Sequence, residues 1–98
     1  YGGSCFRKDV KALVYTARQH GLNFQIVEAV EAVNAEQKKY LFSKVLKHFK
    51  GDLKGKTFVL WGVAFKANTD DIRETPAIDT VVALHQAGAR VRFHDPAA

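Results

Sequence analysis

The sequence predicts an α/β protein, in which a long central helix is followed by a parallel βαβ unit. Apolar residues recur at helical spacing through most of the first fifty residues. After a polar link at 51–56 the pattern changes to a run of β-branched and aromatic residues, which is typical of a strand. A second helical pattern and a second strand follow. A strand–helix–strand order of this length places both strands parallel in one sheet.

Two helices are expected in the first half. Apolar residues three and four apart predict a helix over Lys8–His20, ended by Gly21, with Asp9 in its first turn. A second helix is expected over Gln25–Lys50, roughly 37 Å long at 1.5 Å per residue. Asn34 interrupts its apolar side. Because so long an amphipathic helix in a short chain favours a partner surface, we expect a homodimer through residues 25–50.

The lysine- and glycine-rich link is the best candidate boundary, so we expect two segments, 1–52 and 53–98. In the second, a strand over Thr57–Val63 reads as buried on both faces. A helix capped at Thr75 runs to Ala87, and a strand covers Ala89–Phe93. Two parallel strands need neighbouring strands and helices on both faces, so we expect an internal piece of a longer protein.

Composition excludes several classes of function. The net charge is +5, but the basic residues scatter, and no zinc spacing or aromatic–basic interleaving indicates nucleic acid. The longest uncharged apolar run, Thr57–Phe65, is far shorter than the about 20 residues that span a bilayer. No His/Cys spacing fits a metal site. A single cysteine fits a reducing, cytoplasmic compartment.

That cysteine lies in GGSCFRKD, residues 2–9, which is the strongest candidate site. Cys5 is expected just ahead of a helix N-terminus, where backbone N–H groups favour a thiolate, and Arg7 and Lys8 add positive charge. The glycine pair at 2–3 supplies unobstructed N–H donors, and Asp9, one turn beyond Cys5, could order a water. The pattern indicates covalent chemistry at a carbonyl. The alternative is a buried cysteine acting as a small hydrophobe.

A second candidate site follows the first strand, at GVAFK, residues 62–66. Ligands bind at strand ends in doubly wound sheets. The stretch lacks the G-x-G-x-x-G fingerprint, so it does not indicate dinucleotide binding. Lys66 and Arg73 flank the following loop, either as phosphate ligands or as ordinary surface charges.

Together, GGSCFRKD at 2–9 and GVAFKANTDDIRE at 62–74 resemble motifs of the nucleotide-sugar dehydrogenases that act on UDP-glucose or GDP-mannose. The helix pattern at 33–38 fits as well. The resemblance implies an NAD-binding domain, a central dimerisation helix and a Rossmann-like domain that holds the UDP part of the substrate. This chain would then cover the end of the substrate-binding segment, the central helix and the start of the Rossmann-like domain.

The implied reaction is oxidation of UDP-glucose at C6 to the carboxylate, with NAD as cofactor. The matching positions are Cys5 and Asp9 for catalysis, Lys8 and Arg73 for the cofactor, and Gly2 and Lys66 for the substrate. Arg7 departs from the proline or glutamine of other members and leaves a flexible cation beside the thiol. The family's other catalytic lysine and asparagine and its NAD loop are missing, so the piece alone is expected to be inactive. The alternatives are GDP-mannose oxidation and a non-catalytic helical interaction module.

Overall fold

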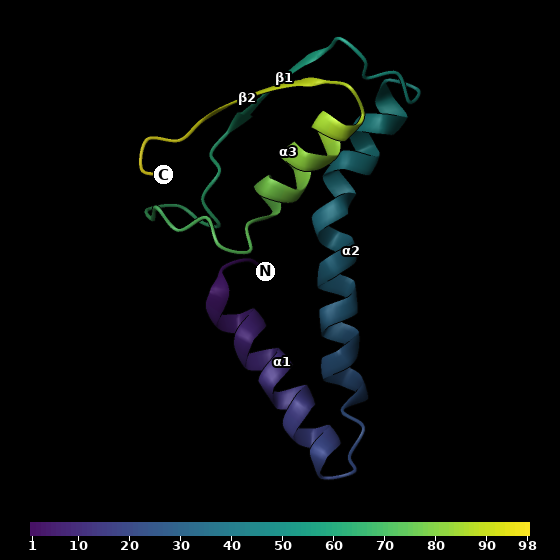
Figure 1. Cartoon of the computed structure of the whole chain (residues 1–98), viewed down its shortest axis with the longest axis vertical. Coiled ribbons are helices and arrows are strands. Elements are labelled where there is room, and N and C mark those ends of the chain that lie inside the picture. Colours follow the sequence, from purple (N-terminus) through teal and green to yellow (C-terminus); the bar gives the residue numbers. More distant parts are fainter.

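The computed structural model describes residues 1–98 and contains three helices and two strands (Figure 1). They are α1 Ser4–Gln19, α2 Gln25–His48, β1 Thr57–Trp61, α3 Pro76–Gln86 and β2 Arg90–His94. The predicted α/β class and order of elements are confirmed. None of the helices combines the length and apolar character that crossing a membrane requires.

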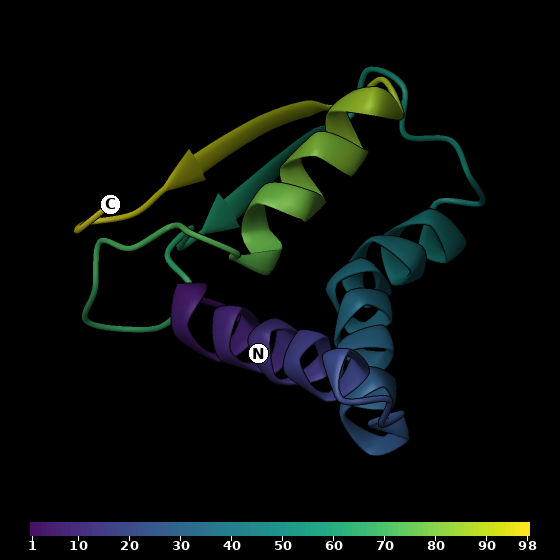
Figure 2. The ribbon, with the colours of Figure 1, turned by 60° about the horizontal axis from the view of Figure 1, so that its bottom comes forward.

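The elements form an open V (Figure 1). One arm is α1, and the other is α2, which continues upward until its second half packs against α3. The two strands lie side by side above α3, so that α3 separates them from the helical hairpin (Figure 2). The N-terminus of α1 therefore comes close to the segment that joins β1 to α3.

The sheet is parallel, with Thr57 opposite Arg90 and Trp61 opposite His94. Exposure alternates along β1, because Phe58 and Leu60 face the core while Val59 and Trp61 point away from it. Trp61 is 88% exposed. The expectation that this strand is buried on both faces is wrong for this chain, because the helices cover only one face of the sheet.

The core joins α2 to the βαβ unit. Its buried members are Leu53, Leu84 and Ala89. The partly buried residues around them are Phe42, Val45, Leu46, Phe49, Phe58, Leu60, Ala87 and Val91. The core thus takes side chains from both sides of the expected boundary after residue 52. The division into 1–52 and 53–98 stays a prediction.

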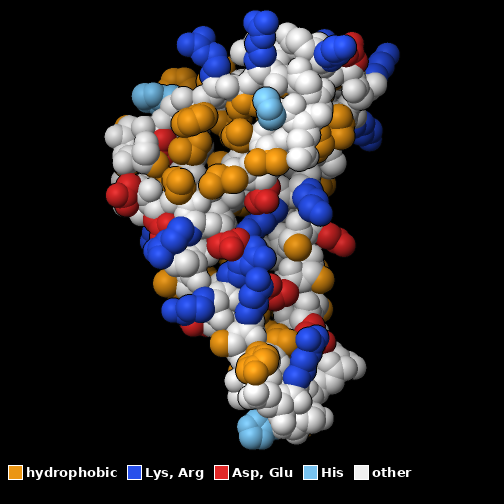
Figure 3. Space-filling view, in the orientation of Figure 1, with side chains coloured by type: hydrophobic (Ala, Val, Ile, Leu, Met, Phe, Trp, Pro, Cys, Tyr) orange, Lys and Arg blue, Asp and Glu red, His pale blue; other side chains and the backbone are white.

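The chain exposes more surface than a compact domain of its size. Its radius of gyration is 16.3 Å, whereas about 13 Å is usual for 100 residues. Its accessible surface is 7395 Å², against about 5,600 Å² from the scaling of surface with mass. Figure 3 shows hydrophobic side chains gathered on the upper part and charges of both signs at mid-height. These apolar surfaces are available for further contacts.

Candidate functional site

The cysteine lies inside a helix. We expected this helix to begin at Lys8, but α1 begins at Ser4. Gly3, at φ 82° and ψ 171°, makes the bend from which the helix starts, in a region essentially restricted to glycine. Cys5 is therefore an exposed residue of the first turn, near the positive end of the helix dipole. Asp9 is not in the first turn. It follows Cys5 by one turn on the same face of the helix.

The glycine pair packs directly against the second motif. A Cβ at Gly2 would lie 2.9 Å from the Glu74 carbonyl oxygen, and one at Gly3 would lie 2.9 Å from Cε2 of Phe65. Such distances leave no room for a side chain. The two motifs thus meet through close approach of backbone, a role that we had not assigned to the glycines. The expected contact of Gly2 with substrate stays a prediction.

This packing brings Arg73 near the thiol. The Arg73 guanidinium donates to both carboxylate oxygens of Asp71, at 3.0 Å from Nε to Oδ1 and 2.8 Å from Nη2 to Oδ2. These bonds hold the pKa of Asp71 at about 2. The pKa of Arg73 is raised, mainly by its hydrogen bonds and charge interaction with Asp71 and to a small extent by Cys5. Arg73 therefore lies within electrostatic range of Cys5. The Arg73 side chain is 70% exposed and open to a further anion.

Glu74 joins three segments through its side chain. Its Oε2 accepts from the Arg7 guanidinium of α1 and, at 3.2 Å, from Nζ of Lys38 of α2. Lys38 is buried, with 9% of its surface exposed. The hydrogen bond from Lys38, with the charge of Arg7, lowers the pKa of Glu74. The expectation of a flexible cation at Arg7 is wrong, because the ion pair with Glu74 fixes that side chain.

Asn34 and Lys38 show what sequence reasoning missed. They lie one turn apart on α2, so two polar side chains share a face toward the first motif. Asn34 Nδ2 donates to the carbonyl oxygen of Tyr1 at 3.1 Å, and Asn34 Oδ1 accepts from the Tyr1 nitrogen at 2.6 Å. Partial burial and a hydrogen bond to Glu31 raise the pKa of Tyr1 to about 12. The polar interruption of α2 was the available signal.

Lys66 lies in a different hollow, at the carboxyl ends of the strands. This hollow of about 560 Å³ is lined by Lys66, Asn68, Thr69 and Asp95 among others, and by no residue of α1. Asp95 accepts four backbone N–H bonds, two from the turn after β1 and two from residues 97–98. These bonds hold the pKa of Asp95 well below its usual range. Asp95 fixes the end of both strands, which sequence reasoning did not foresee.

Lys66 makes no ion pair. Its Nζ lies 5.4 Å from the centre of the Phe65 ring, so its charge is free to meet an anion. Lys8 is exposed and also makes no ion pair. The structure therefore places Arg73 within electrostatic range of Cys5, and Lys66 at the adjoining strand ends. No cluster of His, Cys, Asp and Glu is arranged to hold a metal ion.

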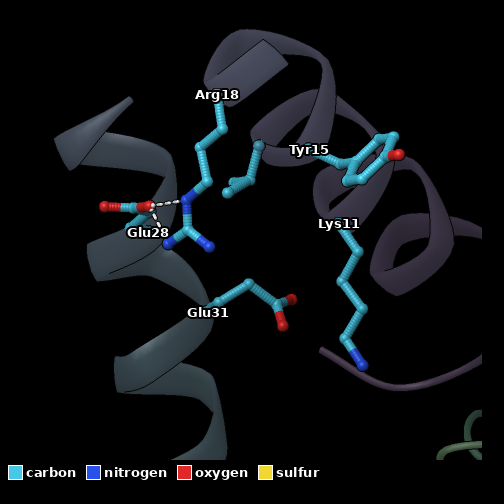
Figure 4. Close-up of a pocket in the computed structure, with 6 residues that line it drawn as sticks. Lys11, Tyr15, Arg18, Glu28 and Glu31 are labelled. Carbon is cyan, nitrogen blue, oxygen red and sulfur yellow. Dashed lines mark hydrogen bonds and ion pairs between the residues drawn. The ribbon is translucent and has the colours of Figure 1, made fainter. Parts of the chain in front are cut away.

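A second charged cluster lies at the far end of the helical hairpin (Figure 4). An open groove of about 340 Å³ runs between α1 and α2, lined by Lys11, Val14, Tyr15, Arg18, Glu28 and Glu31. The Arg18 guanidinium points across it and pairs with Glu28 (Figure 4). No residue that the sequence predicted for the site lies here. The pair holds the two helices together away from the cysteine.

Comparisons with known proteins define the class. Residues 1–36 match the family model described as UDP-glucose/GDP-mannose dehydrogenase family, central domain. Residues 59–98 match the UDP binding domain of the same family. Both models describe dehydrogenases of nucleotide sugars, and they match in the order in which the two motifs occur.

Individual relatives agree. UDP-glucose 6-dehydrogenase of Pseudomonas aeruginosa is 53% identical over all 98 residues. A solved UDP-glucose dehydrogenase from Pyrobaculum islandicum superposes on the whole chain with a TM-score of 0.89 at 40% identity. A ternary complex of GDP-mannose dehydrogenase from Pseudomonas aeruginosa superposes on 97% of the chain with a TM-score of 0.84 at 34% identity. The chain belongs to the UDP-glucose/GDP-mannose dehydrogenase family. It spans about a fifth of these relatives, 22%, 22% and 21% of their lengths.

Proposed function

We propose that the chain is part of an NAD-dependent dehydrogenase that oxidises the C6 alcohol of UDP-glucose to a carboxylate, with Cys5 as the nucleophile. One observation carries this proposal. The first turn of α1, with an exposed Cys5, packs through Gly2 and Gly3 against the loop that bears Arg73. Two motifs about sixty residues apart thus meet at the start of the helix that carries the thiol.

The thiol is suited to an aldehyde at C6, the product of the first oxidation. The Cys5 sulfur forms a C–S bond to that carbon, and the carbonyl oxygen takes up a proton to give a thiohemiacetal. Loss of the C6 hydride, for which NAD would be the acceptor, and of the hydroxyl proton to solvent then leaves a thioester. Water breaks the C–S bond, releasing UDP-glucuronate and the free thiol. The unpaired N–H groups of the first turn of α1 stabilise negative charge on sulfur and on the carbonyl oxygen.

Asp9 is the proposed proton acceptor for the water that resolves the thioester. It lies on the same helical face as Cys5, and it is exposed, with no ion pair to hold its carboxylate elsewhere. A carboxylate one turn away is in range of a water that attacks the carbon bound to sulfur. Exchange of Asp9 for asparagine is therefore expected to slow release of the product more than formation of the thioester.

The residues of this chain are suited to contact NAD but not to enclose it. Arg73 offers an exposed guanidinium held in place by Asp71, and Lys8 offers a second exposed cation on α1. Both are suited to phosphate oxygens. The chain supplies no dinucleotide cradle of its own, so we assign Arg73 and Lys8 a contact and no more. When bound, NAD supplies the hydride acceptor, used twice for each sugar.

The substrate's nucleotide is proposed to meet Lys66. The hollow at the strand ends offers an unpaired ammonium group beside Asn68 and Thr69, a set suited to phosphate and sugar hydroxyls. UDP is favoured over GDP because the UDP-glucose 6-dehydrogenase of Pseudomonas aeruginosa is 53% identical to the chain, whereas the GDP-mannose dehydrogenase is 34% identical. GDP-mannose remains the second candidate, since a GDP-mannose dehydrogenase superposes closely on the chain. Steady-state rates of the complete protein with UDP-glucose and with GDP-mannose separate the two.

Cys5→Ser in the complete protein tests the mechanism. We expect NADH formation from UDP-glucose to fall by about three orders of magnitude, because the hydroxyl lacks the nucleophilicity of a thiolate. Ala12→Ser is the matched control. It places the same hydroxymethyl group at an exposed position on the same helix and should leave the rate unchanged. A Cys5→Ser enzyme with normal NADH production would refute the proposal.

A homodimer through α2 is also proposed. Ile26 is 80% exposed and Val33 64% exposed, and both line an apolar hollow of about 500 Å³ on this helix. Such side chains are typical of a protein–protein surface. Sedimentation of the complete protein should give a dimer or a larger even assembly, and Val33→Glu should dissociate it. A monomer at all concentrations would contradict this. A cytoplasmic location, proposed from the free thiol, accords with this function.

A further inference from the structure

The side chain of Glu74 lies at the meeting point of α1, α2 and the loop before α3. One carboxylate oxygen, Oε2, accepts from both Arg7 and Lys38. Lys38 is buried, and Nε of Arg7 is buried without a hydrogen-bond partner, so two partly desolvated cations depend on one carboxylate. Removing that charge leaves both uncompensated, which such burial makes unfavourable.

The ion pair with Arg7 fixes how α1 is rotated. Successive residues of a helix are turned by about 100°, so Arg7 lies on nearly the opposite side of α1 from Cys5. Because Arg7 pairs with Glu74, Cys5 and Asp9 lie on the side of α1 turned away from the Glu74 carboxylate. A small rotation of α1 would move the sulfur while leaving the helix itself intact.

The backbone of Glu74 ties the same carboxylate to Arg73. Glu74 has a positive φ of 54°, in the left-handed region that non-glycine residues rarely adopt. Its carbonyl oxygen is the atom that closes against Gly2. The residue before it is Arg73, whose charge lies within electrostatic range of Cys5. Glu74 thus contacts α1 through its side chain and the segment just before α1 through its backbone, and it is bonded directly to Arg73.

We propose that Glu74 is a positioning residue for the nucleophile: by binding Arg7 and Lys38 together, its carboxylate sets the placement of Cys5 relative to Arg73. This inference rests on the proposed dehydrogenase function. Glu74 acts through the orientation of α1 and has no chemical role of its own. Its loss should therefore slow the step at sulfur and leave the binding of the nucleotide sugar nearly unchanged.

The test uses the complete enzyme with Glu74→Gln, which keeps the shape and removes the charge. We expect kcat to fall by about 10- to 100-fold while KM for UDP-glucose changes by less than about threefold, because misplacement of a reacting group by about 1 Å has effects of this size. Glu74→Asp, which keeps the charge, should recover most of kcat. The rate at which iodoacetamide alkylates Cys5 without substrate should differ by about threefold or more between Glu74→Gln and wild type. A change of this size is expected when a charge interaction near the surface is altered.

Glu28→Gln is the matched control, because it breaks another Arg–Glu pair made by α1, with α2 at the far end of the hairpin. It should leave kcat and the alkylation rate within about twofold, as expected for an exposed pair. If Glu74→Gln does not fold, Lys38→Gln serves, since it leaves the Arg7 pair in place; we expect a fall in kcat of about threefold to tenfold.

Folded Glu74→Gln or Lys38→Gln enzyme with the wild-type kcat and alkylation rate would overturn the inference. The inference would also be overturned if kcat fell equally in Glu74→Gln and Glu74→Asp, because the charge that Glu74→Asp retains would then have no effect. The proposed function fails by a different result: if the Cys5→Ser enzyme is active, Cys5 is not the nucleophile. If Cys5→Ser is inactive but Glu74→Gln behaves as wild type, only the positioning role of Glu74 is refuted.

Discussion

Exchange of Gly3 for alanine should loosen the start of α1, because the position excludes a side chain for two independent reasons. Its φ of 82° and ψ of 171° lie in a region that is essentially restricted to glycine. A Cβ there would also meet the Phe65 ring at 2.9, 3.0 and 3.3 Å. The helix start and the loop must therefore separate, or the Phe65 ring must move.

The magnitude follows from these two effects. Backbone strain in this region costs about 1–3 kcal/mol, and overpacking against a ring adds about 1–3 kcal/mol, so local opening becomes easier by about 2–6 kcal/mol. Gly21→Ala is the matched control, because Gly21 also has a positive φ, of 71°, but a Cβ added there would meet no atom within 4 Å. It should carry only the left-handed strain of about 1–2 kcal/mol, and at the other end of α1.

Amide hydrogen exchange in the complete protein measures this effect. The amides of residues 8–10 lie among the first that can bond within α1, whose N-cap is Gly3. In Gly3→Ala their protection should fall by a factor of about 30 or more, the equivalent of at least 2 kcal/mol. Gly21→Ala should leave them protected. Protection at residues 8–10 within twofold of wild type in Gly3→Ala would refute the argument that this glycine packs the two motifs together.

Three further predictions concern the loop and α3. The Asp71 carboxyl should titrate with a pKa of about 2 by carbon NMR, and Arg73→Gln should raise this pKa toward the usual ~3.9. The ion pair therefore contributes its full stabilisation of the fold above about pH 4, and this contribution is lost as the pH falls through about 2. Thr75→Ala should cost about 1 kcal/mol in exchange protection of α3, because the Thr75 hydroxyl caps that helix, and Thr75→Ser should restore it. Leu84→Ala should lower the free energy of unfolding by about 2–5 kcal/mol in denaturant melts, whereas half-exposed Val82→Ala should change it by less than about 1 kcal/mol; equal effects would contradict the assigned core.

Much of the fold follows from local signals. Thr75 and Pro76 mark the start of α3 because capping and a fixed φ are local effects. The parallel pairing of the strands follows from the length of their connection. The start of α1 was misplaced by four residues, because Gly3 could be recognised as a helix boundary only from its dihedral angles.

The site was predictable as two motifs but not as one place. Cys5 and Arg73 are candidates from residue type and setting, yet nothing local shows that Gly2 meets Glu74. Lys38 was missed because a buried lysine depends on its partner, and Glu74 lies 36 residues away. The exposed face of β1 was also missed, because the apolar residues of a strand do not show which of its faces other elements cover.

The central claim is that the sulfur of Cys5 becomes bonded to the C6 carbon of the sugar during turnover. The most direct test is rapid acid quench of the complete protein turning over UDP-glucose with NAD, followed by peptide mass spectrometry. Asp9→Asn, in which release should be slow, is the variant of choice. We predict a UDP-glucuronyl thioester on the peptide that contains Cys5, removable by hydroxylamine. Turnover to UDP-glucuronate with Cys5 unmodified at every quench time would contradict the account.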